Sequence, residues 1–161
     1  PSKGLKALLG VLKTNGFLKL GLYSELARKD IIEGRNYINS NKLESNINDI
    51  REFRKTIFSG KIPSLSSLTD SADFYTLSSC RDLCFHAKEH RFTIQQLQEM
   101  LMSHELNFLG FTLSKPIKFL YKRYFPDDKK QTNLQNWVTF EEKYSNTFLG
   151  MYQFWVRKLK T

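Results

Sequence analysis

Apolar residues recur along the chain with two spacings, one typical of helices and one typical of buried strands. Residues 3–14 carry leucines at helical spacing, and Asn15 and Gly16 predict the end of that helix because both tolerate a left-handed backbone. The segment 17–23 follows at once and places its three leucines on one face of a predicted strand. A helix, an Asn-Gly stop and an apolar strand, in this order, favour a parallel sheet covered by helices.

The same two patterns predict the remaining elements. Helices are expected at about 30–40, 47–58, 93–104, 116–125 and 132–144, and strands at 107–113 and 148–157. A D-x-x-E motif from Asp30 and a capping box from Thr93 open two of these helices. The serine-rich segment 59–69 predicts a loop, and 72–90 an irregular, mostly helical segment. This order predicts an α/β fold with a small three-stranded sheet and about six helices.

The charge balance is basic, but the charges are spread along the chain. Among 161 residues, 25 are Lys or Arg and 16 are Asp or Glu, which gives a net charge of +9. Such a balance can indicate nucleic acid or an anionic membrane as a partner. Dense basic patches occur only near Lys118–Arg123 and Arg157–Lys160. We therefore interpret the charge as a solvated surface and expect no nucleic-acid partner.

Cysteine usage and hydropathy predict the compartment. Cys80 and Cys84 are too closely tethered for an ordinary disulfide and too few for a disulfide framework, so reduced thiols in a cytoplasmic protein are expected. No apolar run approaches the ~18 residues needed to cross a bilayer, and no charged-then-apolar leader begins the chain, so no membrane partner is expected. The first residue is Pro1 rather than Met, which suggests a trimmed chain or a piece of a longer protein.

Three segments carry a family resemblance. Residues 9–24 read LGVLKTNGFLKLGLYS, residues 73–92 begin with DFYTLS and end with FHAKEHRF, and residues 147–157 read TFLGMYQFWVR. The first segment resembles the run that ends the fourth helix and makes the fifth strand of class I S-adenosylmethionine (SAM)-dependent methyltransferases. The other two resemble segments of bacterial methyltransferases that are often fused to tetratricopeptide repeats. Together they span nearly the whole chain.

The resemblance implies a partial Rossmann-like methyltransferase fold. The complete family has the sheet order 3-2-1-4-5-7-6, with the last strand antiparallel to the others. Residues 17–23, 107–113 and 148–157 would then be strands five, six and seven, so a mixed sheet of order 5-7-6 is expected. Residues 24–92 would be a helical insertion on the substrate side. The chain 1–161 would form a single domain, the C-terminal half of the fold.

The resemblance also implies SAM as the cofactor of the complete protein. The eight glycines of this chain are isolated, and neither the glycine-rich SAM loop nor the acidic ribose-binding residue of the family is present. We therefore expect no cofactor-binding residue here, and a substrate-side portion of a methyltransferase-like protein that is inactive alone. The acceptor substrate is not identified. The alternatives are a non-catalytic interaction module derived from that fold and a basic nucleic-acid-binding domain.

Some candidate site residues come from the strand end and from the resembling block. Tyr23 and Ser24 end the predicted strand, where open α/β sheets bind ligands, although Ser24 could instead cap the next helix. Arg81 could pair with an anionic group of a substrate.

His86, Glu89 and His90 form an H-x-x-E-H motif, which on a helix places two imidazoles on one face beside a carboxylate. Zinc hydrolysis needs a third ligand, and no downstream motif supplies one, so no metal is expected. The three side chains could instead hydrogen-bond a substrate or accept its proton, or they could pack against neighbouring turns. The motif alone does not choose between these roles.

Two further expectations concern the strands. Phe148, Tyr152, Phe154 and Trp155 could stack on single-stranded nucleic acid, but large groups on both faces favour a central strand covered on both sides. In the resembling family, the strand at 17–23 pairs with a strand that this chain lacks. Its edge is therefore expected to be covered by the N-terminal helix or by a second copy in a homodimer.

Overall fold

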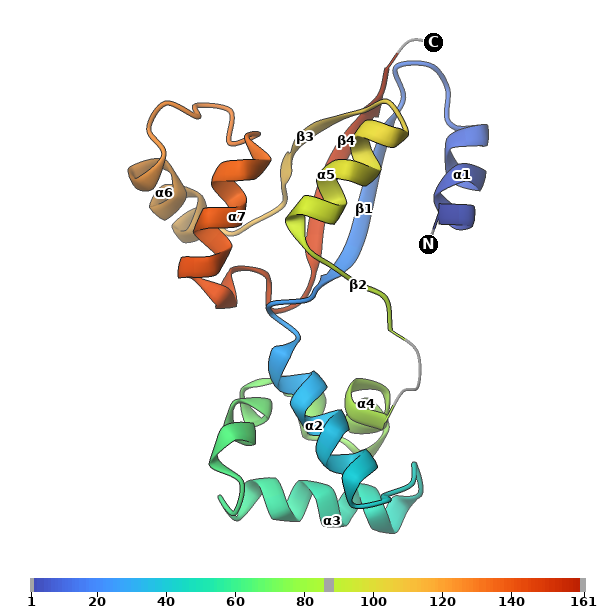
Figure 1. Ribbon diagram of the computed structural model, residues 1–161, viewed down its shortest axis with the longest axis vertical. Coiled ribbons are helices and arrows are strands. Elements are labelled where there is room, and N and C mark those ends of the chain that lie inside the picture. The colour runs from blue at the N-terminus through green and yellow to red at the C-terminus, as the bar shows by residue number, and fades with distance from the viewer. Residues whose placement is uncertain (1, 86–88, 160–161) are drawn as a thin grey trace. The chain divides into compact units, whose positions relative to one another are not determined.

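The computed structural model describes residues 2–85 and 89–159 (Figure 1). The chain divides into two compact units. Unit 1 contains residues 1–27 and 90–161, and unit 2 contains residues 28–89. The residues of unit 2 fall within the sequence range 24–92, which was expected as a helical insertion. None of the helices within the described ranges is both long enough and apolar enough to cross a bilayer.

Unit 1 is built around a mixed sheet with helices beside it. Its elements are α1 (Ser2–Val11), β1 (Phe17–Ser24), β2 (Arg91–Phe92), α5 (Ile94–Ser103), β3 (Leu106–Phe111), α6 (Lys115–Tyr124), α7 (Leu134–Lys143) and β4 (Tyr152–Lys158). The strand order is β2-β1-β4-β3. β4 runs antiparallel to both of its neighbours, and β2 runs parallel to β1.

The sheet differs from the expected one by a fourth strand. β2 adds to the outer edge of β1, where Tyr23 pairs with Arg91 and Ser24 with Phe92. Two residues are too few to produce an alternating pattern, so β2 could not be predicted from the sequence. The helices also exceed the expected six, because part of 72–90 folds into the short helix α4 (Leu77–Cys80). The last strand was expected between the other two long strands, and the observed order β1-β4-β3 agrees with this expectation.

The junction between α1 and β1 follows the predicted Asn-Gly stop. Asn15 adopts a left-handed backbone with φ 61°, and a Cβ on Gly16 would lie 2.7 Å from the carbonyl oxygen of Lys13. The Nζ of Lys158 donates to the carbonyl of Leu9 at 2.9 Å and so satisfies a free carbonyl at the end of α1. The C-terminal end of β4 is thereby fixed to the N-terminal helix.

One face of the sheet forms the core of unit 1. Tyr152, Phe154 and Val156 of β4 are buried on this face, and Trp137 of α7 stacks on Tyr121 of α6 with ring centroids 3.7 Å apart. The three leucines of β1 are half-buried against the same core, so the leucine face is the inward one.

The opposite face of the sheet is exposed. Trp155 of β4 is 44% exposed and Phe17 of β1 is 60% exposed. The expectation of a central strand covered on both faces is therefore wrong for the described residues. β4 is central, but Gln153 and Trp155 alternate with its buried residues and point to the uncovered side.

Unit 2 is helical. Its elements are α2 (Lys29–Ser40), α3 (Ile47–Phe58), 3-10 helices at Pro63–Asp70 and Ala72–Phe74, α4 (Leu77–Cys80) and a π-helical turn at Arg81–Phe85. Its core surrounds Phe53, whose ring lies 6.0 Å from that of Phe74 and 5.7 Å from that of Phe85. Both cysteines are free and buried in this core.

Two local expectations for unit 2 are wrong. Residues 63–70 form a 3-10 helix rather than a loop, because Leu65 and Leu68 are buried in the core of the unit. α2 begins at Lys29, before the D-x-x-E motif, and Asp30 does not cap it. The Asp30 carboxylate instead accepts a hydrogen bond from Ser67 Oγ at 2.5 Å.

Candidate functional site

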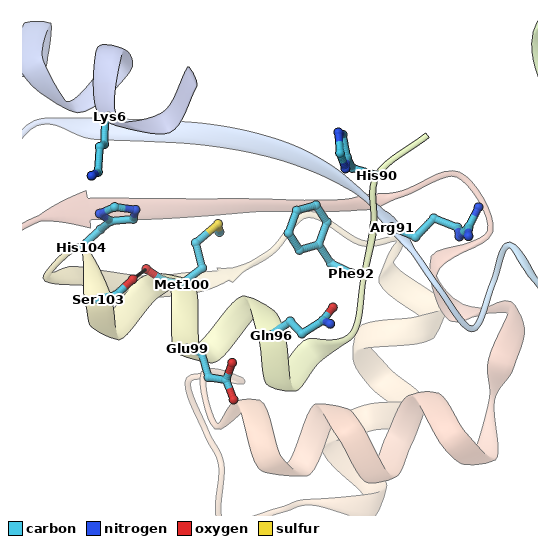
Figure 2. Close-up of a pocket in the computed structure, with 9 residues that line it drawn as sticks. All are labelled: Lys6, His90, Arg91, Phe92, Gln96, Glu99, Met100, Ser103 and His104. Carbon is cyan, nitrogen blue, oxygen red and sulfur yellow. Dashed lines mark hydrogen bonds between the residues drawn. The ribbon is translucent and has the colours of Figure 1, made fainter. Parts of the chain in front are cut away.

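A pocket of about 670 Å³ lies in unit 1 between α1, β2 and α5 (Figure 2). Its lining residues are Lys6, His90, Arg91, Phe92, Gln96, Glu99, Met100, Ser103 and His104. Figure 2 shows Lys6 of α1 extending toward His104 at the end of α5, while His90 and Phe92 come from the segment at β2. The capping box of Thr93 and Gln96 fixes the start of α5 beside this segment. The pocket is therefore formed by elements that are far apart in the sequence.

The lining of this pocket suits an anionic or polar group. Four of the lining residues are basic, namely Lys6, His90, Arg91 and His104, and one is acidic, namely Glu99. Figure 2 shows the Arg91 side chain extending away from Lys6 and His104. Ser103 is the hydroxyl among the lining residues, and it already donates to the carbonyl oxygen of Met100 at 3.0 Å. No hydrogen bond joins this hydroxyl to a basic side chain in the described part of the chain.

Ser24 belongs to a buried network rather than to an open site. Its Oγ donates to Oε1 of Glu141 at 2.6 Å and accepts from the amide of Ala27 at 3.0 Å. The hydroxyl of Tyr152 lies 2.7 Å from Oε2 of the same carboxylate. Burial raises the pKa of Glu141, while the two hydroxyls act in the opposite direction.

The network joins three elements of unit 1. Ser24 ends β1, Glu141 lies on α7 and Tyr152 begins β4. Ser24 is 1% exposed, and it does not cap α2, which begins at Lys29. The expected cap on the next helix is therefore wrong, and the expected ligand-binding role stays a prediction. The carboxylate partner was missed because Glu141 sits within an ordinary helical pattern, with no motif that marks it as buried.

Tyr23 and His90 lie at the same end of the sheet. Tyr23 is half-buried and pairs in register with Arg91, which lines the pocket next to His90. The two candidates are brought together because β2 adds to the C-terminal end of β1. Lys6 and His104 complete the pocket and were not recognised in the sequence, because an isolated basic residue on a helix carries no motif.

The other candidates belong to unit 2. Glu89 forms ion pairs with Arg35 at 3.1 Å and with Arg28 at 3.6 Å, and its side chain is 8% exposed. Its carboxylate is thus committed to the structure of unit 2. Arg81 is exposed on the π-helical turn. His86 lies outside the described residues.

The H-x-x-E-H motif does not continue as a helix. Glu89 and His90 are non-helical, and Arg91 is already in β2. The expectation that a helix places both imidazoles on one face is therefore wrong for His90, which lies outside any helix. Among residues 2–85 and 89–159, no group of three or more His, Cys, Asp or Glu side chains could hold a metal ion.

The residues present do not fit SAM. In the described ranges, only Gly60 and Gly110 among the glycines have positive φ, at 70° and 127°. Gly60 follows α3, and Gly110 lies within β3, so neither belongs to a loop that joins a strand to a helix N-terminus.

Comparison with known proteins gives no family. No family model matches the chain, and no curated protein matches it.

Proposed function

We propose that this chain is the substrate-side, C-terminal portion of a class I SAM-dependent methyltransferase-like protein. The strand order carries the proposal. β4, the last strand in the sequence, lies between β1 and β3 and is antiparallel to both. The resemblance of residues 9–24, 73–92 and 147–157 implies the same arrangement, 5-7-6 with an antiparallel last strand. β1 and β3 are consequently parallel, with α5 between them in the sequence, as a crossover connection requires.

The outer edge of β1 supports the same assignment. In the resembling family this edge pairs with strand four. Here β2 pairs only with Tyr23 and Ser24, so the segment 17–22 has no strand partner on that side within the described residues. An apolar strand with unpaired amides and carbonyls favours the addition of another strand. The SAM-binding half would supply it, and a second copy of this chain is the alternative occupant.

The two ends of unit 2 support an insertion. At its boundary, the first residue, Arg28, forms an ion pair with the last, Glu89. On the side of unit 1, the amide of Glu25 donates to the carbonyl oxygen of Phe92 at 2.9 Å. The chain therefore leaves unit 1 and re-enters it at one place, which is the geometry that lets an inserted unit be added without disturbing a sheet.

In this proposal, the pocket beside β2 binds a polar part of the acceptor substrate. Lys6, which extends toward His104 in Figure 2, would hold an anionic or carbonyl group there. The sequence contains no glycine-rich SAM loop, so we expect the chain to be inactive alone.

The test is SAM binding by a longer polypeptide. The coding sequence upstream should encode about 150 residues, one domain, with a glycine-rich loop after its first strand. Calorimetry should show saturable SAM binding for the longer polypeptide and none for residues 1–161. A bulky substitution in the glycine-rich loop is the matched control and should abolish binding. SAM binding by the short chain, or an upstream region without such a loop, would overturn the proposal.

A further inference from the structure

The exposed face of the sheet combines aromatic and basic side chains. Trp155 lies directly opposite Lys19, and Phe17 lies directly opposite Arg157. We define the aromatic–basic face as Phe17, Lys19, Leu109, Trp155 and Arg157, all of which belong to unit 1. Directly opposed residues in a sheet have Cβ atoms about 5 Å apart, and same-face neighbours along a strand are roughly 7 Å apart. Each ring therefore has a cation beside it.

The positive charge of the protein is concentrated in the unit that carries this face. Residues 28–89 contain ten Lys or Arg and nine Asp or Glu, so eight of the nine net positive charges belong to unit 1. The strands β1, β3 and β4 contain no Asp or Glu at all. The scatter of basic residues along the sequence thus becomes an uneven distribution between the units.

A small basic pocket continues the face at its β3 side. It has a volume of about 270 Å³, and Trp155 and Leu109 line it together with Lys118 and Lys130. β3 bulges between Phe108 and Gly110, and Gly110 takes φ 127°, a backbone that other residues rarely adopt. The two lysines come from α6 and from the loop after it. Two cationic side chains therefore line the same pocket as the exposed indole of Trp155.

We propose that the aromatic–basic face binds single-stranded nucleic acid. Trp155 and Phe17 would stack on bases, since every base offers a ring face to an exposed aromatic side chain. Lys19 and Arg157 would contact the backbone phosphates between them, and Arg157 Nε has no hydrogen-bond partner among the described residues. Of the four aromatic residues at the end of the chain, only Trp155 can take this role, because Phe148, Tyr152 and Phe154 are buried.

Electrostatics distinguishes this occupant from a second copy of the chain. Two copies joined through this face would bring Lys19 and Arg157 of each copy together without an acidic residue from the strands to compensate them. Like charges that face each other destabilise a contact, whereas a phosphate chain neutralises them and releases counterions. The inference goes beyond the proposed function, because neither the strand order nor the pocket beside β2 enters it.

The experiment uses residues 1–161 and fluorescein-labelled oligonucleotides of about 8 nucleotides, a length within the range that one binding face covers. Fluorescence anisotropy with single-stranded RNA, single-stranded DNA and duplex DNA should show tighter binding of a single strand than of the duplex. If Lys19, Arg157, Lys118 and Lys130 each contact a phosphate, the slope of log Kd against log salt concentration should have a magnitude of about 3. Of the two tryptophans, Trp137 is buried, so quenching of the exposed tryptophan should accompany binding.

Variants separate stacking from charge. Trp155→Thr, which keeps a strand-forming residue, should weaken binding about 5- to 150-fold, and Lys19→Gln should reduce the salt slope by about 0.7. Tyr75→Ala and Lys61→Gln change exposed residues of the same kinds in unit 2 and are the matched controls. Each should leave Kd within about twofold. Circular dichroism checks that every variant is folded.

Three results would overturn the inference. They are equal affinity for single strands and duplex, unchanged Kd in folded Trp155→Thr, and a dimer that becomes monomeric in Trp155→Thr while no oligonucleotide binds. Light scattering detects the dimer. Failure here leaves SAM binding by the longer polypeptide unaffected, so the two proposals are tested separately.

Discussion

The buried carboxylate of Glu141 gives a sharp prediction for the variant Tyr152→Phe. Tyr152 is fully buried, and its hydroxyl lies 2.7 and 2.9 Å from the two oxygens of Glu141. The substitution removes this donor without changing the ring that packs in the core. Ser24 then remains as the side-chain donor to the carboxylate.

The size of the effect depends on the charge of Glu141. A hydrogen bond to a charged group contributes about 1.5–3 kcal/mol, and one between neutral groups about 0.5–1.5 kcal/mol. Burial raises the pKa of Glu141 above its value in the unfolded chain, so the folded protein keeps this proton to higher pH. The stability contributed by the protonated form is present at low pH and is lost as the pH rises through the folded pKa. We therefore expect Tyr152→Phe to cost about 1 kcal/mol near pH 4 and about 2 kcal/mol above the folded pKa.

Urea unfolding followed by tryptophan fluorescence measures this difference, because Trp137 and Trp155 both belong to unit 1. Tyr124→Phe is the control, since the Tyr124 hydroxyl accepts a hydrogen bond from Tyr144 at the surface and should cost less than about 0.5 kcal/mol. A Tyr152→Phe cost that is the same at every pH between 4 and 8.5 would refute a buried carboxylate held by this hydroxyl.

Three other substitutions test the local structure. Asp128→Asn should cost about 1–3 kcal/mol at neutral pH, because the Asp128 carboxylate accepts from the Tyr121 hydroxyl at 2.6 Å. Burial acts to raise the pKa of Asp128, but the hydrogen bonds from the Tyr121 hydroxyl and from backbone amides lower it. The stability that the ionised carboxylate contributes is therefore lost as the pH falls through the folded pKa. The free energy of unfolding should depend less on pH in the acid range in Asp128→Asn than in the unmodified chain, and an unchanged dependence would contradict this. Thr93→Ala should cost about 0.5–2 kcal/mol in urea unfolding, with Thr93→Ser as the control that keeps the cap. Arg35→Gln should speed amide exchange across 28–58, because Glu89 loses its closest ion-pair partner, and unchanged exchange would mean that the pair does not stabilise unit 2.

The sequence predicted the elements whose pattern is local. The helix at 47–58 was predicted at the observed bounds, because apolar residues recur along it at helical spacing, and Ile50, Phe53 and Ile57 are buried. The capping box at Thr93 is confirmed for the same reason. β2 could not be predicted, since its two residues are a strand only because β1 lies beside them. The 3-10 helix at 63–70 was also missed, because turn-forming residues hid the two leucines that tertiary packing buries.

The site was less accessible to sequence analysis than the fold. Tyr23 and His90 do lie at one end of the sheet in unit 1. Ser24, however, is buried and donates a hydrogen bond to Glu141, which is 117 positions away in the sequence. Such a partner depends on how α7 packs against β1 and β4, and spacing along the chain does not encode it. The exposed position of Trp155 has the same origin, because an aromatic strand looks the same whether one face or both faces are covered.

The outer edge of β1 offers the most direct test of the central claim, that a strand from a SAM-binding half adds there. Amide hydrogen exchange of a peptide covering 17–24 should be measured in residues 1–161 and in the longer polypeptide. In the short chain, alternate amides of 17–22 should exchange rapidly, because β4 pairs with only one side of β1. In the longer polypeptide, the same amides should become protected. Equal exchange of this peptide in both proteins would contradict the claim.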